Sequence, residues 1–275
     1  MLEPNFSESQ LQQAVNSAFI RLIFEECEQW AFANVPSLFD EFWLGWDSAF
    51  YFPWLPHPSL EEHEGCNFFI QYKLSYELTT GGAGQWEYWK EPYLRFKIPH
   101  KTKGPNGKHQ DDFHQWERLK ELANQNYPTY YATNSTLNKD NLKEISKNGS
   151  LLSKTPFLDV RDITQLHKYV TFKQKSDFFL LHSEIEKTSK VSSDVIFGRL
   201  RETRKNSLSE SNRLLYRSLE ELAVNDESWR LDLRQISDSL SSESELDKVW
   251  IVRSLLSNFV RHHIGAHLYW YPTHG

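Results

Sequence analysis

The stretch of residues 67–76 constrains the fold more than any other part of the chain. Its sequence is NFFIQYKLSY, in which the first half is largely apolar and polar residues follow. A run of this kind is expected in a strand that is covered on both faces, so it predicts a buried strand inside an α/β domain. Side chains alternate along a strand, so Gln71 and Lys73 share one face.

Helical patterns flank this strand. Residues 9–31 form one apolar stripe with three- and four-residue spacing, and Glu25 and Glu26 fall on its two edges. Residues 111–126 start with Asp at a capping position and stop before Pro128, which predicts a second helix. Further strands are predicted at 41–52, 92–98, 129–133 and 156–160, and a basic loop at 99–110.

This order of elements predicts an α/β domain that spans residues 1–165. Residues 166–275 are predicted to form a mainly α-helical region for recognition or assembly. Its periodic stretches, 194–223, 229–240 and 245–268, are separated by linkers rich in Ser and charge.

The composition indicates a globular, cytoplasmic protein. Of the 275 residues, 25% are charged and 39% hydrophobic, and the apolar runs are shorter than the ~18 residues that cross a bilayer. The N-terminus lacks the features of a signal peptide, so we expect no membrane contact. Cys27 and Cys66 cannot form a disulfide framework, which agrees with a reducing compartment.

Charge is distributed unevenly along the chain. The net charge of -6 argues against bulk electrostatic binding of nucleic acid. However, residues 1–72 hold one basic residue, Arg21, against eleven acids, and positive charge begins at Lys73. An acidic pocket with basic flanks suits metal-dependent phosphodiester chemistry, and two solvated faces of opposite sign would give the same pattern.

Two short segments, Gly45-Trp46-Asp47 and Gln71-Tyr72-Lys73, carry a resemblance to a known family. Of the chain's 18 lysines, Lys73 is the only one with Asp, Glu or Gln two positions before it, in Gln71-Tyr72-Lys73. A buried lysine needs a partner, and Asp47 in the preceding predicted strand is the natural candidate. Over roughly residues 9–135 the chain resembles the PD-(D/E)xK nuclease superfamily, with its restriction-endonuclease-like fold, in a variant with Gln in place of the second acid.

The resemblance implies a metal-dependent nuclease that hydrolyses phosphodiester bonds of nucleic acid, DNA in preference to RNA. Mg²⁺ or Mn²⁺ would be bound by Asp47, the Gln71 amide oxygen, the Tyr72 carbonyl and Glu41, and Glu26 is the other candidate for the additional acid. Lys73 would orient the attacking water and offset charge on the phosphate. By analogy, such a protein serves as an effector subunit in bacterial defence against phage or foreign DNA.

Other interpretations stay open from the sequence. Gln in place of an acid is compatible with an inert nuclease-like scaffold, or with a nucleic-acid-binding subunit of a larger complex. The C-terminal helices could bind a protein partner or a second copy of the chain. Gln71 and Lys73 could also form the ordinary polar face of an edge strand. Trp86 and Trp89 could stack on unpaired bases or pack in the core.

Overall fold

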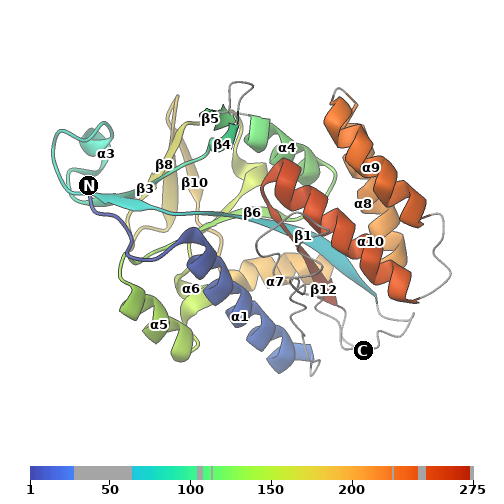
Figure 1. Ribbon diagram of the computed structural model, residues 1–275. Coiled ribbons are helices and arrows are strands. Elements are labelled where there is room, and N and C mark those ends of the chain that lie inside the picture. The colour runs from blue at the N-terminus through green and yellow to red at the C-terminus, as the bar shows by residue number, and fades with distance from the viewer. Residues whose placement is uncertain (28–63, 104–107, 113, 225, 241–245, 273–275) are drawn as a thin grey trace. The chain divides into compact units, whose positions relative to one another are not determined.

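The computed structural model describes residues 1–27, 64–103, 108–112, 114–224, 226–240 and 246–272. They combine α-helices with β-strands (Figure 1). The chain divides into two compact units, one made of residues 1–19 and 70–198, the other of residues 20–69 and 199–275. This division differs from the expected boundary near residue 165.

Helix α1 (Glu8–Cys27) begins in the first unit, close to the predicted start at residue 9. Ser7 and Gln10 form a capping box, in which each side chain accepts the backbone N–H of the other at 3.1 Å. Leu11, Val15 and Phe19 are at most 1% exposed, which confirms the apolar stripe.

Strand β1 (Glu64–Lys73) begins in the second unit and ends in the first, at Ile70–Lys73. Strand β6 (Thr129–Thr133) lies between β1 and β7 (Phe157–Asp159) in the sheet. Helix α4 (His114–Asn124) follows the predicted 111–126 pattern and packs on β6. The predicted strands at 129–133 and 156–160 are therefore confirmed, as is the burial of the strand over residues 67–73.

A second sheet of the first unit corrects the expectation for residues 166–192. Its antiparallel order is β10 (Glu186–Ser189), β9 (Phe178–His182), β8 (Tyr169–Phe172), β3 (Tyr93–Lys97) and β2 (Tyr76–Leu78). Residues 169–189 are thus strands and not part of a helical region. These runs are short, and β8 is held by pairing with β3, more than 70 residues earlier in the chain.

The basic stretch 99–110 is also more ordered than expected. Its described residues contribute to an antiparallel hairpin of β4 (His100–Lys103) and β5 (His109–Asp112), and residues 104–107 lie outside the description. The other elements of the first unit are short: α3 (Trp86–Trp89), α5 (Lys139–Lys147), α6 (Leu151–Lys154), the 3-10 helix η1 (Val160–Asp162) and most of α7 (Ser193–Glu202).

The aromatic residues of α3 take part in packing. Trp89 is 7% exposed, stacks on Phe178 with ring centroids 5.4 Å apart, and donates its indole N–H to Thr171 Oγ1 at 2.9 Å. This arrangement favours the core-packing interpretation of Trp89 over base stacking. Trp86 is partly buried against the same cluster.

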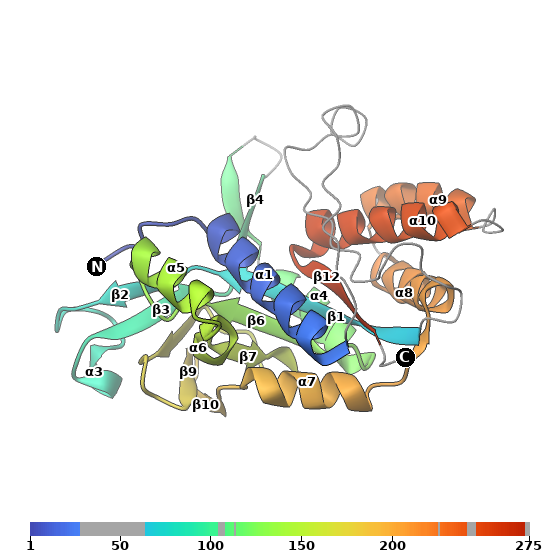
Figure 2. The same cartoon turned by 90° about the horizontal axis from the view of Figure 1, so that it is seen from below.

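The second unit is mainly helical, as predicted beyond residue 194. Helices α8 (Leu208–Leu222), α9 (Glu227–Leu240) and α10 (Leu246–Phe259) pack on one another (Figure 2). A π-helical turn, η2 (Val260–Ile264), then ends at Gly265 with φ 75°. The chain continues as strand β12 (His267–Pro272), so the predicted helix stops earlier than residue 268.

Strand pairing in the second unit joins the first half of β1 to β11 (Asn206–Ser207) and to β12. A Cβ atom at Gly65 would lie 2.5 Å from the Trp270 ring and from the Tyr271 carbonyl oxygen, so only glycine permits this close approach. Buried polar bonds tie the helices to β1: Arg253 donates to Asn67, and Asn67 donates to the Ser211 carbonyl at 3.2 Å. Among the described residues, no helix is long and apolar enough to cross a membrane.

Candidate functional site

The end of β1 presents polar side chains to two helices. Tyr72 donates its hydroxyl to Asn16 Oδ1 of α1 at 3.1 Å. Gln71 and Lys73 point the other way and both bond to Gln115 of α4. Since neighbouring side chains of a strand point to opposite faces, α1 and α4 cover opposite faces of this segment. The expected shared face of Gln71 and Lys73 is confirmed.

The polar groups on the α4 side form a directed chain of hydrogen bonds. Lys73 Nζ donates to Gln115 Oε1 at 2.9 Å, and Gln115 Nε2 donates to Gln71 Oε1 at 3.3 Å. Gln71 Nε2 then donates to the Tyr72 carbonyl oxygen at 2.7 Å. An ammonium group can only donate, so Lys73 fixes the orientation of both amides.

The Lys73 ammonium is buried next to a neutral partner. Lys73 is 7% exposed and Gln71 3%, which rules against an edge strand with a solvated polar face. Burial lowers the pKa of Lys73 from 10.5 to about 8. The carboxylates of Glu8 and Asp112 raise that pKa in part, and the Lys97 ammonium lowers it further.

Glu8 is a candidate site residue that the sequence reasoning missed. Burial raises the pKa of its carboxyl group, although the residue as a whole is exposed. The Lys73 ammonium and a hydrogen bond from the Leu74 backbone act in the opposite direction. One signal was visible: Glu8, Gln12 and Asn16 recur every four residues, which places a polar stripe on α1 beside its apolar one.

Asp112 brings a second carboxylate towards Lys73 from the start of α4. Its Oδ1 accepts the backbone N–H of His114 at 3.0 Å and so satisfies a free donor at the helix start. Its Oδ2 accepts Arg118 Nη1 at 2.9 Å. The predicted capping role at the start of this helix is therefore taken by Asp112, which holds the turn that carries Gln115.

The other predicted site residues divide into three groups. Asp47 and Glu41 lie outside the described residues, so their predicted roles remain predictions. Glu26 belongs to α1, but its side chain is outside the description. Glu25 forms an exposed ion pair with Arg21 at 2.8 Å, four residues away, which is a solvated surface contact.

The donor atoms of this site suit a hard divalent cation in type. Mg²⁺ takes oxygen ligands, and the Gln71 amide oxygen and the Tyr72 carbonyl oxygen both lie in the bonded chain. Within that chain the Gln71 oxygen accepts from Gln115, and the Tyr72 carbonyl oxygen accepts from Gln71. Within the described ranges, no group of three or more His, Cys, Asp or Glu residues could hold a metal. The predicted carboxylate ligands Asp47 and Glu41, and the side chain of Glu26, lie outside these ranges.

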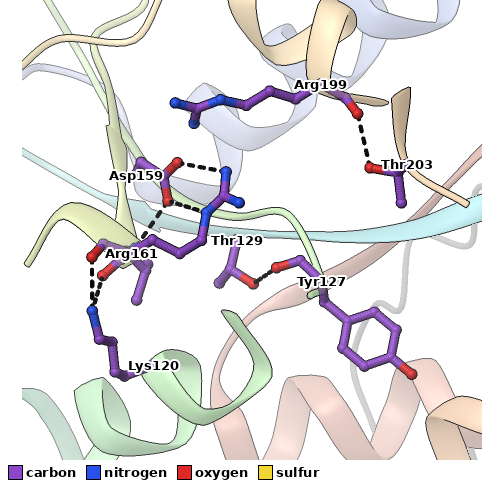
Figure 3. A network of polar contacts seen from close by, with 8 residues as sticks. Lys120, Tyr127, Thr129, Asp159, Arg161, Arg199 and Thr203 are labelled. Carbon is purple, nitrogen blue, oxygen red and sulfur yellow. Dashed lines mark hydrogen bonds and ion pairs between the residues drawn. The ribbon is translucent and has the colours of Figure 1, made fainter. Parts of the chain in front are cut away.

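The later turns of α4 make a different polar network (Figure 3). Lys120 Nζ donates to the carbonyl oxygens of Arg161 at 2.7 Å and Ile163 at 2.8 Å, and more weakly to that of Val160 at 3.4 Å. Asp159, which is fully buried, accepts the Arg161 backbone N–H at 2.9 Å and its Nη2 at 3.1 Å. These bonds fix η1 against α4.

Cys66 contributes a buried thiol in the second unit. It is not in a disulfide, in agreement with the sequence analysis, and burial raises the pKa of its thiol. The Lys205 ammonium acts against that increase. A raised pKa keeps the thiol protonated, so Cys66 is not an activated nucleophile.

Comparisons of the chain with protein-family models, with curated proteins and with solved structures give no match. The geometry of the site is therefore the basis of the functional argument.

Proposed function

We propose that the protein is a metal-dependent nuclease with a restriction-endonuclease-like core, and that the end of β1 carries its active site. The observation that supports this proposal is the buried cluster of Gln71 and Lys73, joined through Gln115 and influenced by the carboxylates of Glu8 and Asp112. Among the described residues no carboxylate forms an ion pair with Lys73; a buried ammonium in that situation is costly in a purely structural role, and such perturbed groups concentrate at functional sites.

In this proposal each residue of the cluster has a defined task. The Lys73 ammonium donates a hydrogen bond to the attacking water and offsets negative charge on the phosphate as the bond breaks. The Gln71 amide oxygen and the Tyr72 carbonyl, together with Asp47 and Glu41 or Glu26, would hold Mg²⁺ or Mn²⁺. When bound, the cation supplies charge neutralisation and a more acidic water.

The two amides that flank Lys73 have a positioning role. Gln115 orients Gln71 and Lys73 at the same time, because its oxygen accepts from one and its nitrogen donates to the other. The pKa of Lys73 is lowered to about 8, so the ammonium form is in the majority at neutral pH. The same pKa is close enough to neutral pH for Lys73 to exchange a proton with water.

A second candidate function is a catalytically inert, nuclease-like nucleic-acid-binding subunit. One observation favours it: the Gln71 and Tyr72 oxygens both already accept hydrogen bonds within the chain. A cation would have to compete with these bonds, and an amide gives weaker electrostatic attraction than a carboxylate. Assembly through α8, α9 and α10, and service in bacterial defence, are compatible with either function and are part of the proposal.

A cleavage assay separates the two candidates. Supercoiled plasmid and labelled single-stranded DNA and RNA are incubated with Mg²⁺, Mn²⁺ or EDTA, with wild type and with the Lys73→Ala and Asp47→Asn variants. The nuclease proposal expects cation-dependent cleavage that both substitutions abolish while circular dichroism shows a retained fold. Cleavage that survives both substitutions would reject this site, and binding without any cleavage would support the inert subunit.

A further inference from the structure

Four cationic side chains gather on the first unit next to the Lys73 cluster. We call them the basic face: Arg95 and Lys97 on β3, Lys101 on the β4–β5 hairpin, and Lys168 just before β8. Arg95 and Lys97 share one face of their strand because they stand two positions apart. Lys101 and Lys168 are exposed, and the Lys97 side chain is 33% exposed.

Lys97, Lys101 and Lys168 are grouped around one carboxylate, that of Asp111: Lys101 pairs with Asp111 across the β4–β5 hairpin, and the Lys168 carbonyl accepts the N–H of Ile98, next to Lys97. Lys97 Nζ bonds to Asp111 Oδ2 at 2.5 Å. This hydrogen bond lowers the pKa of Asp111, and the charges of Lys97, Lys168 and Lys101 lower it further. One carboxylate thus faces three ammonium groups, so the group keeps an excess of positive charge.

An aromatic ring holds the cations in place. Arg95 lies over the Tyr169 ring with its guanidinium carbon 4.5 Å from the centroid, and Lys168 Nζ is 5.6 Å from the same centroid. Arg95 Nη1 also donates to Gln85 Oε1 at 3.0 Å. Side chains that are ordered in advance lose less conformational entropy when they bind a ligand.

The basic face adjoins the candidate active site. Asp112 caps the turn of α4 that carries Gln115, and Gln115 accepts a hydrogen bond from Lys73. Asp111 and Asp112 are neighbours in β5, and Asp112 acts on Lys73 while Asp111 bonds to Lys97. A chain of anionic groups bound along the basic face would therefore extend to Lys73.

We propose that the basic face binds the phosphate backbone of a nucleic-acid strand and guides it to the Lys73 cluster. The part of the inference that leads the strand to the Lys73 cluster rests on the proposed function. Binding to the basic face does not require hydrolysis. Regularly spaced phosphates match separate cations better than one small anion does, and lysine and arginine contacts to phosphate supply sequence-independent affinity. Recognition through the backbone expects little dependence on base sequence.

The test is a binding measurement in EDTA, so that cleavage cannot interfere. Fluorescence anisotropy follows a fluorescein-labelled oligothymidylate across a series of KCl concentrations. The variant Lys97→Gln/Lys101→Gln/Lys168→Gln is compared with wild type. The matched control Lys143→Gln/Lys147→Gln/Lys154→Gln removes the same charge from exposed lysines of α5 and α6.

The proposal expects the basic-face variant to bind about 10-fold or more weakly, with the slope of log Kd against log salt reduced by about 2, while the control stays within about 2-fold of wild type. Equal loss in both variants, unchanged binding in the basic-face variant, or equal affinity of wild type for polyglutamate would overturn it. A duplex probe run in parallel reports which form of the backbone binds more tightly.

A cleavage assay on the same samples keeps this inference separate from the proposed function. Wild type that binds but does not cleave, with binding lost in the basic-face variant, supports the basic face and rejects the nuclease. Wild type that cleaves, with binding unchanged in the basic-face variant, rejects the basic face and supports the nuclease.

Discussion

Helix α4 contacts two polar regions that satisfy buried charge in opposite ways. In its first turn, Gln115 offers one neutral oxygen to the Lys73 ammonium, and the carboxylates of Glu8 and Asp112 act without an ion pair to it. In a later turn, Lys120 donates to the carbonyl groups around η1, where Asp159 pairs with Arg161 (Figure 3).

The difference indicates what each region is for. Around Lys120, donors and acceptors are matched within the chain, which is the arrangement expected of a structural contact. Around Lys73, the part of the chain that the structure describes offers the buried charge a single, neutral hydrogen-bond partner, so an anionic ligand or a cation-bound phosphate can still improve the electrostatics. This contrast supports the proposal that the active site lies at Lys73, and it gives the Lys120 region a structural role.

The largest expected contrast is in cleavage. Lys73→Met is expected to reduce the rate constant of Mg²⁺-dependent DNA cleavage by about 100-fold or more, because it removes the charge that stabilises the transition state. Lys120→Met is expected to leave that rate constant unchanged at a temperature where the variant is folded. Single-turnover cleavage of a labelled oligonucleotide measures both, and equal losses would end the distinction between the two regions.

The second contrast is in the free energy of unfolding, which is expected to change in opposite directions in the Lys120 and Lys73 variants. Lys120→Met leaves carbonyl groups of Arg161 and Ile163 without their donor, so the free energy of unfolding is expected to fall by about 1–3 kcal/mol. Lys73→Met replaces a buried ammonium with an apolar side chain of similar length, and the free energy of unfolding at neutral pH is expected to stay the same or rise. Urea denaturation monitored by circular dichroism measures these values.

Measuring stability as a function of pH sharpens the comparison of Lys73→Met with wild type. The pKa of Lys73 in the folded chain, about 8, is below its usual value of 10.5, so between these limits the unfolded chain binds more protons. The contribution of Lys73 to stability therefore rises with pH across this window, while its burial cost is fully present below pH 8. The advantage of Lys73→Met over wild type should shrink from pH 8 upwards, with the exposed-lysine variant Lys143→Met as the baseline.

Cleavage by wild type should follow the protonation of the same group. The ammonium form of Lys73 is the active form in the proposal, so the cleavage rate should decrease as pH rises through about 8. A rate that instead increases through this range would assign Lys73 the role of a general base. Rates are measured at constant ionic strength with saturating Mg²⁺.

Local patterns predicted part of this site because they depend on the backbone alone. The alternation of β1 placed Gln71 and Lys73 on one face, and the burial of that face followed from its apolar start. Gln115 could not be recognised, because its role depends on how α4 packs against β1. The role of Glu8 could not be recognised either, because it lies on the polar stripe at the start of α1 and its effect on Lys73 depends on how that helix packs.

The fold shows the same limit. Helix α4 and strand β6 were predicted closely because capping residues, proline and apolar spacing act over a few residues. Strands β8, β9 and β10 were mistaken for part of a helical region because their pairing is decided elsewhere: Tyr169 pairs with Lys97 and His182 with Tyr169. Pairs between residues so far apart in the chain cannot be recognised from the sequence pattern of about ten neighbouring residues.

The most direct test of the central claim is cation binding without nucleic acid. Isothermal titration calorimetry with Mn²⁺ compares wild type with Gln71→Glu, which places a carboxylate beside Gln115, and with Lys120→Met. The account predicts measurable binding by wild type, about 10-fold tighter binding by Gln71→Glu because a carboxylate replaces the amide ligand, and no change in Lys120→Met. Failure of Gln71→Glu to bind Mn²⁺ more tightly than wild type would contradict the assignment of a cation site to the end of β1.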